Sequence, residues 1–334
     1  MSENPFNARP PFTSINLLEE LESEKEPLKF LVESLIPERS ITMLVAPPGT
    51  GKSTLSIQLA CELSSGLLAF RGLKTERILN IYYVMAERFA FEAFDKMRYM
   101  KQRIPINHDH LWIDDCMKGA DTLKPTHVEY MIKRIEQNCP HPDIIFLDPI
   151  YSLVPGGLSK DEPSAQFCRF CNVLQSKFSC SLWLNHHTSR ETYNKDGDKI
   201  EKAKAYYGST WLDALVSGMY ELDPRKDQSG CVLVRKKDNF GVLAKEIPLT
   251  FDHDTCISIL ADEYVTENKK LRILAYLNKC YEQKKETSTH DIMTHTGAGV
   301  RYIKNIILDP LFKPKIERKD CIGKQTFYKI VSPL

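Results

Sequence analysis

The chain has 334 residues, of which 42% are hydrophobic and 27% charged, and its net charge at pH 7 is +1. This composition is ordinary for a globular protein and excludes a disordered or collagen-like chain. No apolar run approaches the ~20 residues that a membrane helix needs, and the polar start does not resemble a signal peptide. We therefore expect a cytoplasmic protein, or one of the host cytoplasm if it is viral, with no membrane partner.

Charge is unevenly distributed along the chain. Residues 267–334 hold 14 Lys and Arg against 7 Asp and Glu, a net charge of +7, whereas the remainder holds 31 basic and 37 acidic residues, a net charge of −6. A basic end on an acidic body indicates an anionic partner such as nucleic acid. The near-neutral total argues against a general, charge-driven DNA coat.

Helices and strands alternate through most of the chain after a polar arm at residues 1–27. Apolar runs predict strands at 40–46, 78–85, 111–114, 143–147 and 181–185. Helical spacing predicts helices at 55–68, 89–102, 126–138 and 164–178. This alternation predicts a parallel sheet covered on both faces, and three short strands at 219–222, 231–235 and 257–260 predict an antiparallel edge.

The last 68 residues have a different pattern. Helices are predicted at 269–281, from Ser288, and at 300–308, followed by two strands between 316 and 331. Three helices and a hairpin are the order of a winged helix, in which Arg301 and Lys304 would share one face of the third helix. We therefore predict an arm at 1–27, an α/β core at 28–262 and a winged-helix-like basic domain at 267–334. That domain binds DNA or, on the alternative interpretation, docks against protein.

The strongest motif is Ala46-Pro-Pro-Gly-Thr-Gly-Lys-Ser-Thr54, which lies between a predicted strand and a predicted helix. Glycines there let backbone N–H groups face a phosphate, and the helix N-terminus adds partial positive charge. We expect Lys52 to reach the β- and γ-phosphates of ATP and Ser53 to place its hydroxyl on Mg²⁺. The ATP-binding residues are predicted to be Pro48, Gly49, Thr50, Gly51, Lys52, Ser53 and Thr54. The alternative is an ordinary glycine turn.

Three further polar groups are predicted at the same sheet edge. Asp148 ends a buried strand and can hold Mg²⁺, although Asp148-Pro149 can also be only a turn. Glu87 follows the second core strand and can activate the attacking water, or be a surface Glu at a helix start. His186 and His187 follow the strand at 181–185 and point in different directions. One of them is expected to sense the γ-phosphate, with a strand-end His of no role as the alternative.

Together these motifs resemble the RecA-like ATPases, and within them the RepA-like and DnaB-type hexameric helicases. The resemblance rests on the residues of the phosphate loop and on Tyr83–Glu87, Ile144–Asp148 with Pro149, Leu184–Thr188 and Gly208–Asp213. The resemblance covers residues 28–260 and implies that Glu87 is the catalytic carboxylate and that His187 belongs to a His-His signature. It also implies a ring or filament with ATP between subunits, most simply a hexameric ring.

The resemblance further implies a basic finger that reaches the neighbouring subunit. The segment Val234-Arg-Lys-Lys-Asp-Asn-Phe-Gly241 resembles the finger strand, with Asn239 at the usual Arg position. The candidates are therefore Arg235, Lys236 and Lys237, of which Arg235 and Lys237 are assigned to catalysis. The alternative is a solvated, charged strand end.

Single-stranded DNA is the partner that the resemblance implies, bound by loops at 151–163 and 189–207. Both are polar, and aromatic side chains in the second can stack on bases; plain surface connections are the alternative. The leading hypothesis is a Mg²⁺-ATP-hydrolysing motor, a replicative DNA helicase or translocase. The alternatives are a recombination, annealing or helicase-loading factor that uses ATP as an assembly switch, and a clock- or signalling-type ATPase that does not bind DNA.

Overall fold

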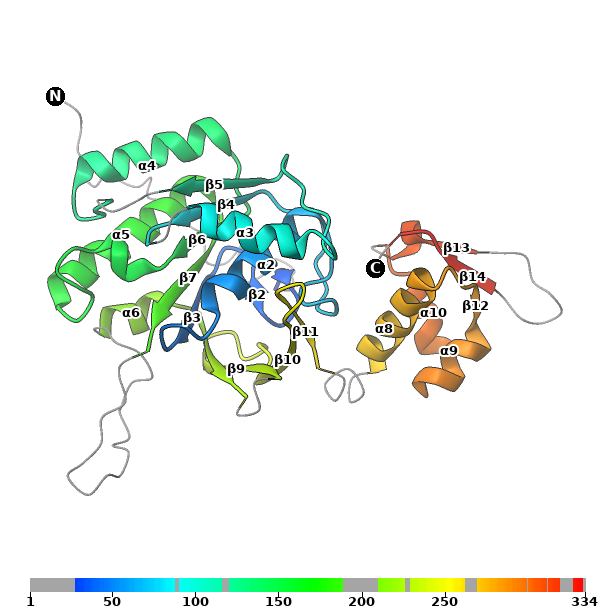
Figure 1. Cartoon of the computed structure of the whole chain (residues 1–334). Helices are drawn as coiled ribbons and strands as arrows, with labels where there is room; N and C mark the ends of the chain where they lie inside the picture. The colour runs from blue at the N-terminus through cyan, green and yellow to red at the C-terminus, as the bar shows by residue number, and fades with distance from the viewer. Residues whose placement is uncertain are drawn as a thin grey trace, which may run out of the picture.

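Figure 1 shows a computed structural model of the chain, which describes residues 28–87, 90–115, 120–188, 210–225, 229–261, 269–298, 300–310, 312–318 and 327–332. The predicted arm at 1–27 and the second predicted DNA loop at 189–207 lie outside these ranges.

A nine-stranded sheet with the order β11-β10-β9-β8-β3-β7-β6-β4-β5 organises the larger part of the chain. Its strands are β3 (Ile41–Ala46), β4 (Ile81–Met85), β5 (Leu111–Asp115), β6 (Ile144–Asp148), β7 (Ser181–His187), β8 (Gly218–Pro224), β9 (Gly230–Asp238), β10 (Glu246–Asp252) and β11 (Ile257–Leu260). Across the sheet, β5 pairs with β4, β4 with β6, β6 with β7, β7 with β3 and β3 with β8, and all of these pairings are parallel. The remaining pairings, of β8 with β9, β9 with β10 and β10 with β11, are antiparallel. The predicted parallel α/β sheet with an antiparallel edge is therefore confirmed.

Helices cover both faces of this sheet because its central strands are apolar on both sides (Figure 1). One face packs against α2 (Lys52–Ser64) and α3 (Ala90–Met100). The other packs against α4 (Pro125–Asn138), α5 (Asp161–Phe178) and α6 (Thr210–Leu215). Strands β3, β4 and β6 are buried along their whole lengths, which explains their continuous apolar sequences.

Four local expectations differ from the structure. The strand predicted at 219–222 is part of β8, which pairs antiparallel with β9 as predicted but also pairs in parallel with β3. Strand β10 was not predicted, because Pro248 interrupts its alternating pattern; it pairs with β9 on one side and β11 on the other. Residues 30–37, for which no element was predicted, form a small hairpin of β1 (Phe30–Val32) and β2 (Ile36–Pro37). Both His186 and His187 belong to β7 rather than following it.

The C-terminal residues form a smaller unit around their own apolar cluster. Its elements are α8 (Lys269–Glu282), β12 (Thr287–Ser288), α9 (Thr289–Thr296), α10 (Val300–Ile307), the 3₁₀ turn η2 (Lys313–Lys315), β13 (Ile316–Arg318) and β14 (Phe327–Ile330). The three strands form an antiparallel sheet in the order β12-β14-β13, and a reciprocal capping box of Ser288 and Asp291 starts α9. The winged-helix interpretation and the domain limits stay predictions.

The two units meet at the chain segment that follows α2. Leu68 is buried in the apolar cluster of the C-terminal unit. Two ion pairs flank it: Arg71 to Glu282 at 3.5 Å and Lys74 to Asp309 at 3.4 Å. The segment after the phosphate-loop helix is therefore linked to the C-terminal unit by direct contacts.

Two further observations concern the described residues alone. None of their helices is long and apolar enough to cross a membrane. They also contain no cluster of three or more His, Cys, Asp and Glu that could hold a metal ion, and their cysteines are free thiols.

Candidate nucleotide site

The phosphate loop connects the end of β3 to the start of α2. Ala46, which stands where the common motif has Gly, is the last residue of β3 and needs no left-handed backbone. Gly49 and Gly51 have φ values of +80° and +96°, and a Cβ on either would meet no protein atom within 4 Å. Both glycines are therefore required by backbone conformation, and the space beside them is open to a ligand. Thr50 does not line that space, and instead its hydroxyl donates to the Pro47 carbonyl at 2.8 Å.

Lys52 begins α2, and its amine is folded back onto the loop. The amine donates to the carbonyl oxygens of Ala46 at 2.7 Å and Pro47 at 2.9 Å, and lies 3.2 Å from Nδ1 of His187. Burial lowers the pKa of Lys52 to about 8, against the opposing influence of the negative charges of Asp148 and Glu87. An arriving phosphate would supply the counter-charge that this buried amine lacks.

Asp148 ends β6 beside the start of α2. Its Oδ1 accepts a hydrogen bond from the Ser53 hydroxyl at 3.2 Å, and its Oδ2 accepts one from the Tyr83 hydroxyl at 2.5 Å. A carboxylate and a hydroxyl at the end of the phosphate loop are oxygen ligands that suit Mg²⁺, either directly or through water. Ser53 and Asp148, predicted as the metal pair, are thus placed together with no protein group between them.

Glu87 lies two residues beyond β4 at the same sheet edge. Met85 pairs with Asp148 in the parallel register of β4 and β6, and the Ala86 N–H donates to the Asp148 carbonyl at 2.8 Å. The Glu87 carboxylate accepts a hydrogen bond from the hydroxyl of Tyr151, which belongs to the 3₁₀ turn η1 (Ile150–Leu153). Glu87 is thereby oriented across the end of β6.

The two histidines of β7 point to opposite sides of the sheet, as predicted from strand geometry. His186 is buried, whereas His187 is half-buried and faces the phosphate loop. Its ring packs against Tyr151, with ring centres 4.8 Å apart. Burial and the neighbouring Lys52 lower the pKa of His187, so the imidazole is neutral at pH 7 and Nδ1 can accept from the Lys52 amine.

These groups surround one cavity of ≈370 Å³. It is lined by Pro48, Gly49, Gly51, Lys52, Ser53, Thr54, Glu87, Lys96, Asp148, Pro149, Tyr151 and His187. A Mg²⁺-bound nucleoside triphosphate requires glycines with free space beside them, a buried amine, a hydroxyl–carboxylate pair for the metal and a second carboxylate. The geometry therefore fits Mg²⁺-ATP.

Two lining residues, Tyr151 and Lys96, and the buried Tyr83 beneath the cavity were not assigned an individual role from the sequence. Tyr83 and Tyr151 donate to the two functional carboxylates, and Lys96 on α3 adds a second cation to the cavity. Tyr83 and Lys96 lie inside ordinary apolar or amphipathic patterns, and Tyr151 follows Asp-Pro in a loop, so no local motif marks them. Only the pairing of β4 with β6 and the packing of α3 bring them to the site.

The predicted finger segment lies at the opposite edge of the sheet from the phosphate loop. Asp238 pairs with Gly218 of β8, and Gly218 pairs with Thr42 near the start of β3. Neither Arg235 nor Lys237 lines the cavity of its own chain. Their assignment as cations acting on a neighbouring subunit stays a prediction.

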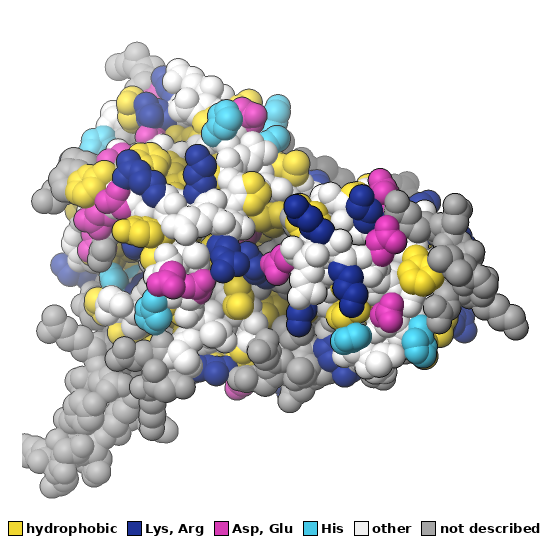
Figure 2. Space-filling model, turned by 45° about the vertical axis from the view of Figure 1, so that its right-hand side comes forward, with side chains coloured by type: hydrophobic (Ala, Val, Ile, Leu, Met, Phe, Trp, Pro, Cys, Tyr) yellow, Lys and Arg dark blue, Asp and Glu magenta, His cyan; other side chains and the backbone are white. Residues whose placement is uncertain are grey.

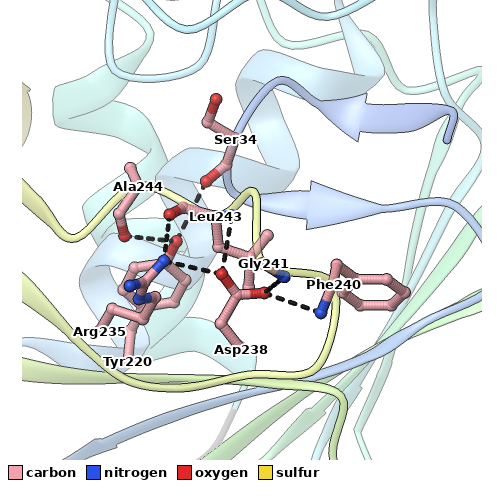
Figure 3. A network of polar contacts seen from close by, with 8 residues as sticks. All are labelled: Ser34, Tyr220, Arg235, Asp238, Phe240, Gly241, Leu243 and Ala244. Atoms are coloured by element: carbon pink, nitrogen blue, oxygen red, sulfur yellow. Dashed lines mark hydrogen bonds and ion pairs between the residues drawn. The ribbon is translucent and has the colours of Figure 1, made fainter.

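Arg235 is held in a polar network within its own chain (Figure 3). Its guanidinium donates to Asp238 Oδ2 at 2.7 Å and to the Leu243 carbonyl at 2.6 Å. Asp238 in turn accepts backbone N–H groups of Phe240, Gly241 and Leu243. The network closes the turn after β9. By contrast, Lys236 pairs with Glu221 at 2.7 Å, and Lys237 donates to the Asp213 carbonyl.

The first predicted DNA loop, residues 151–163, contains regular structure and buried apolar residues. Residues 150–153 form η1, α5 begins at Asp161, and Leu153, Val154 and Leu158 are buried in the core. On the face that Figure 2 shows, Lys and Arg side chains are scattered among acidic and apolar ones rather than forming one continuous basic track. DNA contact by this loop stays a prediction.

The lowered pKa of Lys52 predicts that nucleotide affinity depends on pH. Bound phosphate favours the charged amine, whereas the amine of the free protein loses its proton above pH 8. At high pH the Lys52 amine must therefore take up a proton when the nucleotide binds. We expect the affinity for ADP to be lower at pH 9.5 than at pH 7.5 by a factor of about ten or more. Calorimetry across this range measures the effect. Lys52→Arg, which keeps its charge, should give a flat profile, and a flat profile in the wild type would contradict the prediction.

The network of Figure 3 predicts that Arg235 stabilises the fold. Arg235→Ala leaves Asp238, whose side chain is only 6% exposed, without its cation. We expect the free energy of unfolding to fall by about 2 kcal/mol in urea titrations. Lys236→Ala removes a more exposed pair and should cost less than about 0.5 kcal/mol. Equal losses in the two variants would show that the Arg235 network does not stabilise the turn.

Comparisons with known proteins place the chain in a family. A family model described as an AAA domain (AAA_25) matches residues 6–192, which is more than half of the chain. A search of curated proteins found no match. Among solved structures, a KaiC-like protein of the hyperthermophilic archaeon Pyrococcus horikoshii aligns with a TM-score of 0.47 and 13% identity, over 70% of this chain and 100% of that one. The family match spans the phosphate loop, Glu87, Asp148 and His187, and the chain therefore belongs to the AAA domain family of P-loop proteins.

Proposed function

We propose that the chain hydrolyses Mg²⁺-ATP and couples hydrolysis to movement on single-stranded DNA, as a replicative helicase or translocase. The observation that carries the hydrolytic part is the convergence of Lys52, Asp148 and Glu87 on one cavity, from three separate stretches of sequence. When bound, Mg²⁺ would neutralise charge between the β- and γ-phosphates and would be held by Ser53 and Asp148.

Each side chain has a distinct part in the proposed reaction. Lys52 would exchange its bonds to the loop carbonyls for the β- and γ-phosphates of ATP. Glu87 would accept a proton from the attacking water at the far side of the γ-phosphate. His187, neutral and within reach of Lys52, is placed to respond to the γ-phosphate through a hydrogen bond.

Support for a DNA partner comes from the C-terminal unit. In α10, Ile303, Ile306 and Ile307 are buried, and the opposite face exposes Arg301, Lys304, Asn305 and Leu308. That spacing of three and four residues gives one continuous face with two cations and an amide, groups that contact phosphates and base edges. The position of α10 as the third helix of the unit matches that of the recognition helix in helix-turn-helix proteins.

Replacing Glu87 by glutamine, its amide, tests the proposed role of this residue. Glu87→Gln keeps the size of the side chain and removes its basicity, so we expect kcat to fall by roughly 100-fold or more with ATP affinity nearly unchanged. A phosphate-release assay and equilibrium binding of ATP give the two values. Glu92→Gln makes the same change of charge on α3 beside the cavity and serves as the matched control. Rapid hydrolysis by Glu87→Gln would show that another group is the base.

The motor proposal is tested on forked DNA. We expect strand separation that requires ATP, is stimulated by single-stranded tails and is lost in Glu87→Gln. A fork left intact by an active, DNA-stimulated ATPase would favour the recombination, annealing or loading factor. A rate of ATP hydrolysis that is the same with and without DNA would favour the clock- or signalling-type ATPase. Electron micrographs with ATP and single-stranded DNA would separate the proposed hexameric ring from a filament.

A further inference from the structure

Tyr83 lies at the centre of β4 and is buried beneath the nucleotide cavity. It pairs with Phe146 in the parallel register of β4 and β6, and the two rings stack with centres 5.2 Å apart and planes inclined by 8°. Phe146 and Asp148 are two residues apart on β6, so both side chains lie on the same face of the sheet. A ring stacked on Phe146 therefore extends its hydroxyl toward Asp148, which it reaches at 2.5 Å.

The two oxygens of Asp148 consequently have different surroundings. Oδ1 faces the Ser53 hydroxyl at the end of the phosphate loop, and Oδ2 faces the Tyr83 hydroxyl below it. In this hydrogen bond the phenol O–H donates and the carboxylate oxygen accepts.

We propose that Tyr83 is a positioning residue for the Mg²⁺ of the nucleotide site, because its hydroxyl fixes the Asp148 carboxylate with Oδ1 directed at Ser53. This inference rests on the proposed function. Without the phenol, Oδ2 of Asp148, a residue only 6% exposed, would lose its hydrogen-bond donor, and the carboxylate would gain by turning away. Hydrogen-bond partners of metal-binding side chains typically change metal affinity by 10–100-fold when removed.

The chain supplies a matched control in the adjacent residue. Tyr82 is equally buried on the same strand, and its side chain points to the other face of the sheet. Its hydroxyl donates to Asp114 Oδ2 at 2.8 Å, remote from the phosphate loop. Tyr82→Phe and Tyr83→Phe each remove one hydroxyl and one buried hydrogen bond to a carboxylate, so a general loss of stability is shared by both variants.

The experiment measures binding of a fluorescent, non-hydrolysable ATP analogue to the full chain as Mg²⁺ is increased from a chelator-treated baseline. We expect the Mg²⁺ concentration for half-maximal binding to rise about tenfold in Tyr83→Phe and to stay unchanged in Tyr82→Phe. Metal-free binding should be equal in all three proteins. Phe146→Leu keeps the hydroxyl but removes the stacked ring that directs it, and should raise the Mg²⁺ requirement by a smaller factor.

The outcomes separate the inference from the function on which it rests. The role of Tyr83 would be overturned, and the proposed function left standing, by either of two results. One is an unchanged Mg²⁺ requirement in both Tyr83→Phe and Phe146→Leu; the other is an equal rise of that requirement in Tyr82→Phe. A wild-type chain whose nucleotide binding is indifferent to Mg²⁺ would overturn the proposed function, and the inference with it.

Discussion

The parallel alignment of β3, β7, β6 and β4 is the constraint on which the site depends. Because the strands run in one direction with fixed registers, their carboxyl ends meet at one edge, and the residues that follow them are brought together. Ala46 leads into the phosphate loop, Met85 leads to Glu87, β6 ends at Asp148 and β7 at His187. The cavity is therefore a consequence of strand direction, and a single reversed pairing among these strands would disperse it.

A second layer of contacts fixes the direction of the side chains at this edge. Beneath the phosphate loop, the Ser56 hydroxyl, the Asn185 amide and the Trp183 indole form a buried hydrogen-bonded cluster that ties α2 to β7. Tyr83 and Tyr151 hold the two carboxylates. Buried polar groups must be satisfied within the protein, so these contacts leave few alternative arrangements of the site. The helix that carries Lys52 and the strand that carries His187 are coupled through this cluster.

Local sequence was sufficient to find the groups predicted to act on phosphate, and insufficient to find the side chains that hydrogen-bond to them. The motif ending in Lys52 and Ser53, and the apolar strand ending in Asp148, are short patterns with their own physical reason. Tyr83 is indistinguishable in sequence from Tyr82 beside it, because which one faces Asp148 depends on the register of β4 with β6. The direction of β8 and the existence of β10 depended on tertiary pairing in the same way, and Pro248 concealed β10 further.

The contacts among the residues of the site imply that nucleotide binding would be an exchange of hydrogen bonds. Lys52 is satisfied by the Ala46 and Pro47 carbonyls, Ser53 by Asp148, and Glu87 by Tyr151. When a phosphate binds Lys52, or a metal binds Ser53, an existing hydrogen bond is lost. The free energy gained is therefore only the difference between the new contact and the one it replaces. Asp148 Oδ2 is the exception, because its partner Tyr83 is buried and does not line the cavity, so a ligand in the cavity would not directly replace this bond. The site thus combines exchangeable contacts on the side of the cavity with a buried one beneath it, and in our proposal the buried contact directs Asp148 toward the metal.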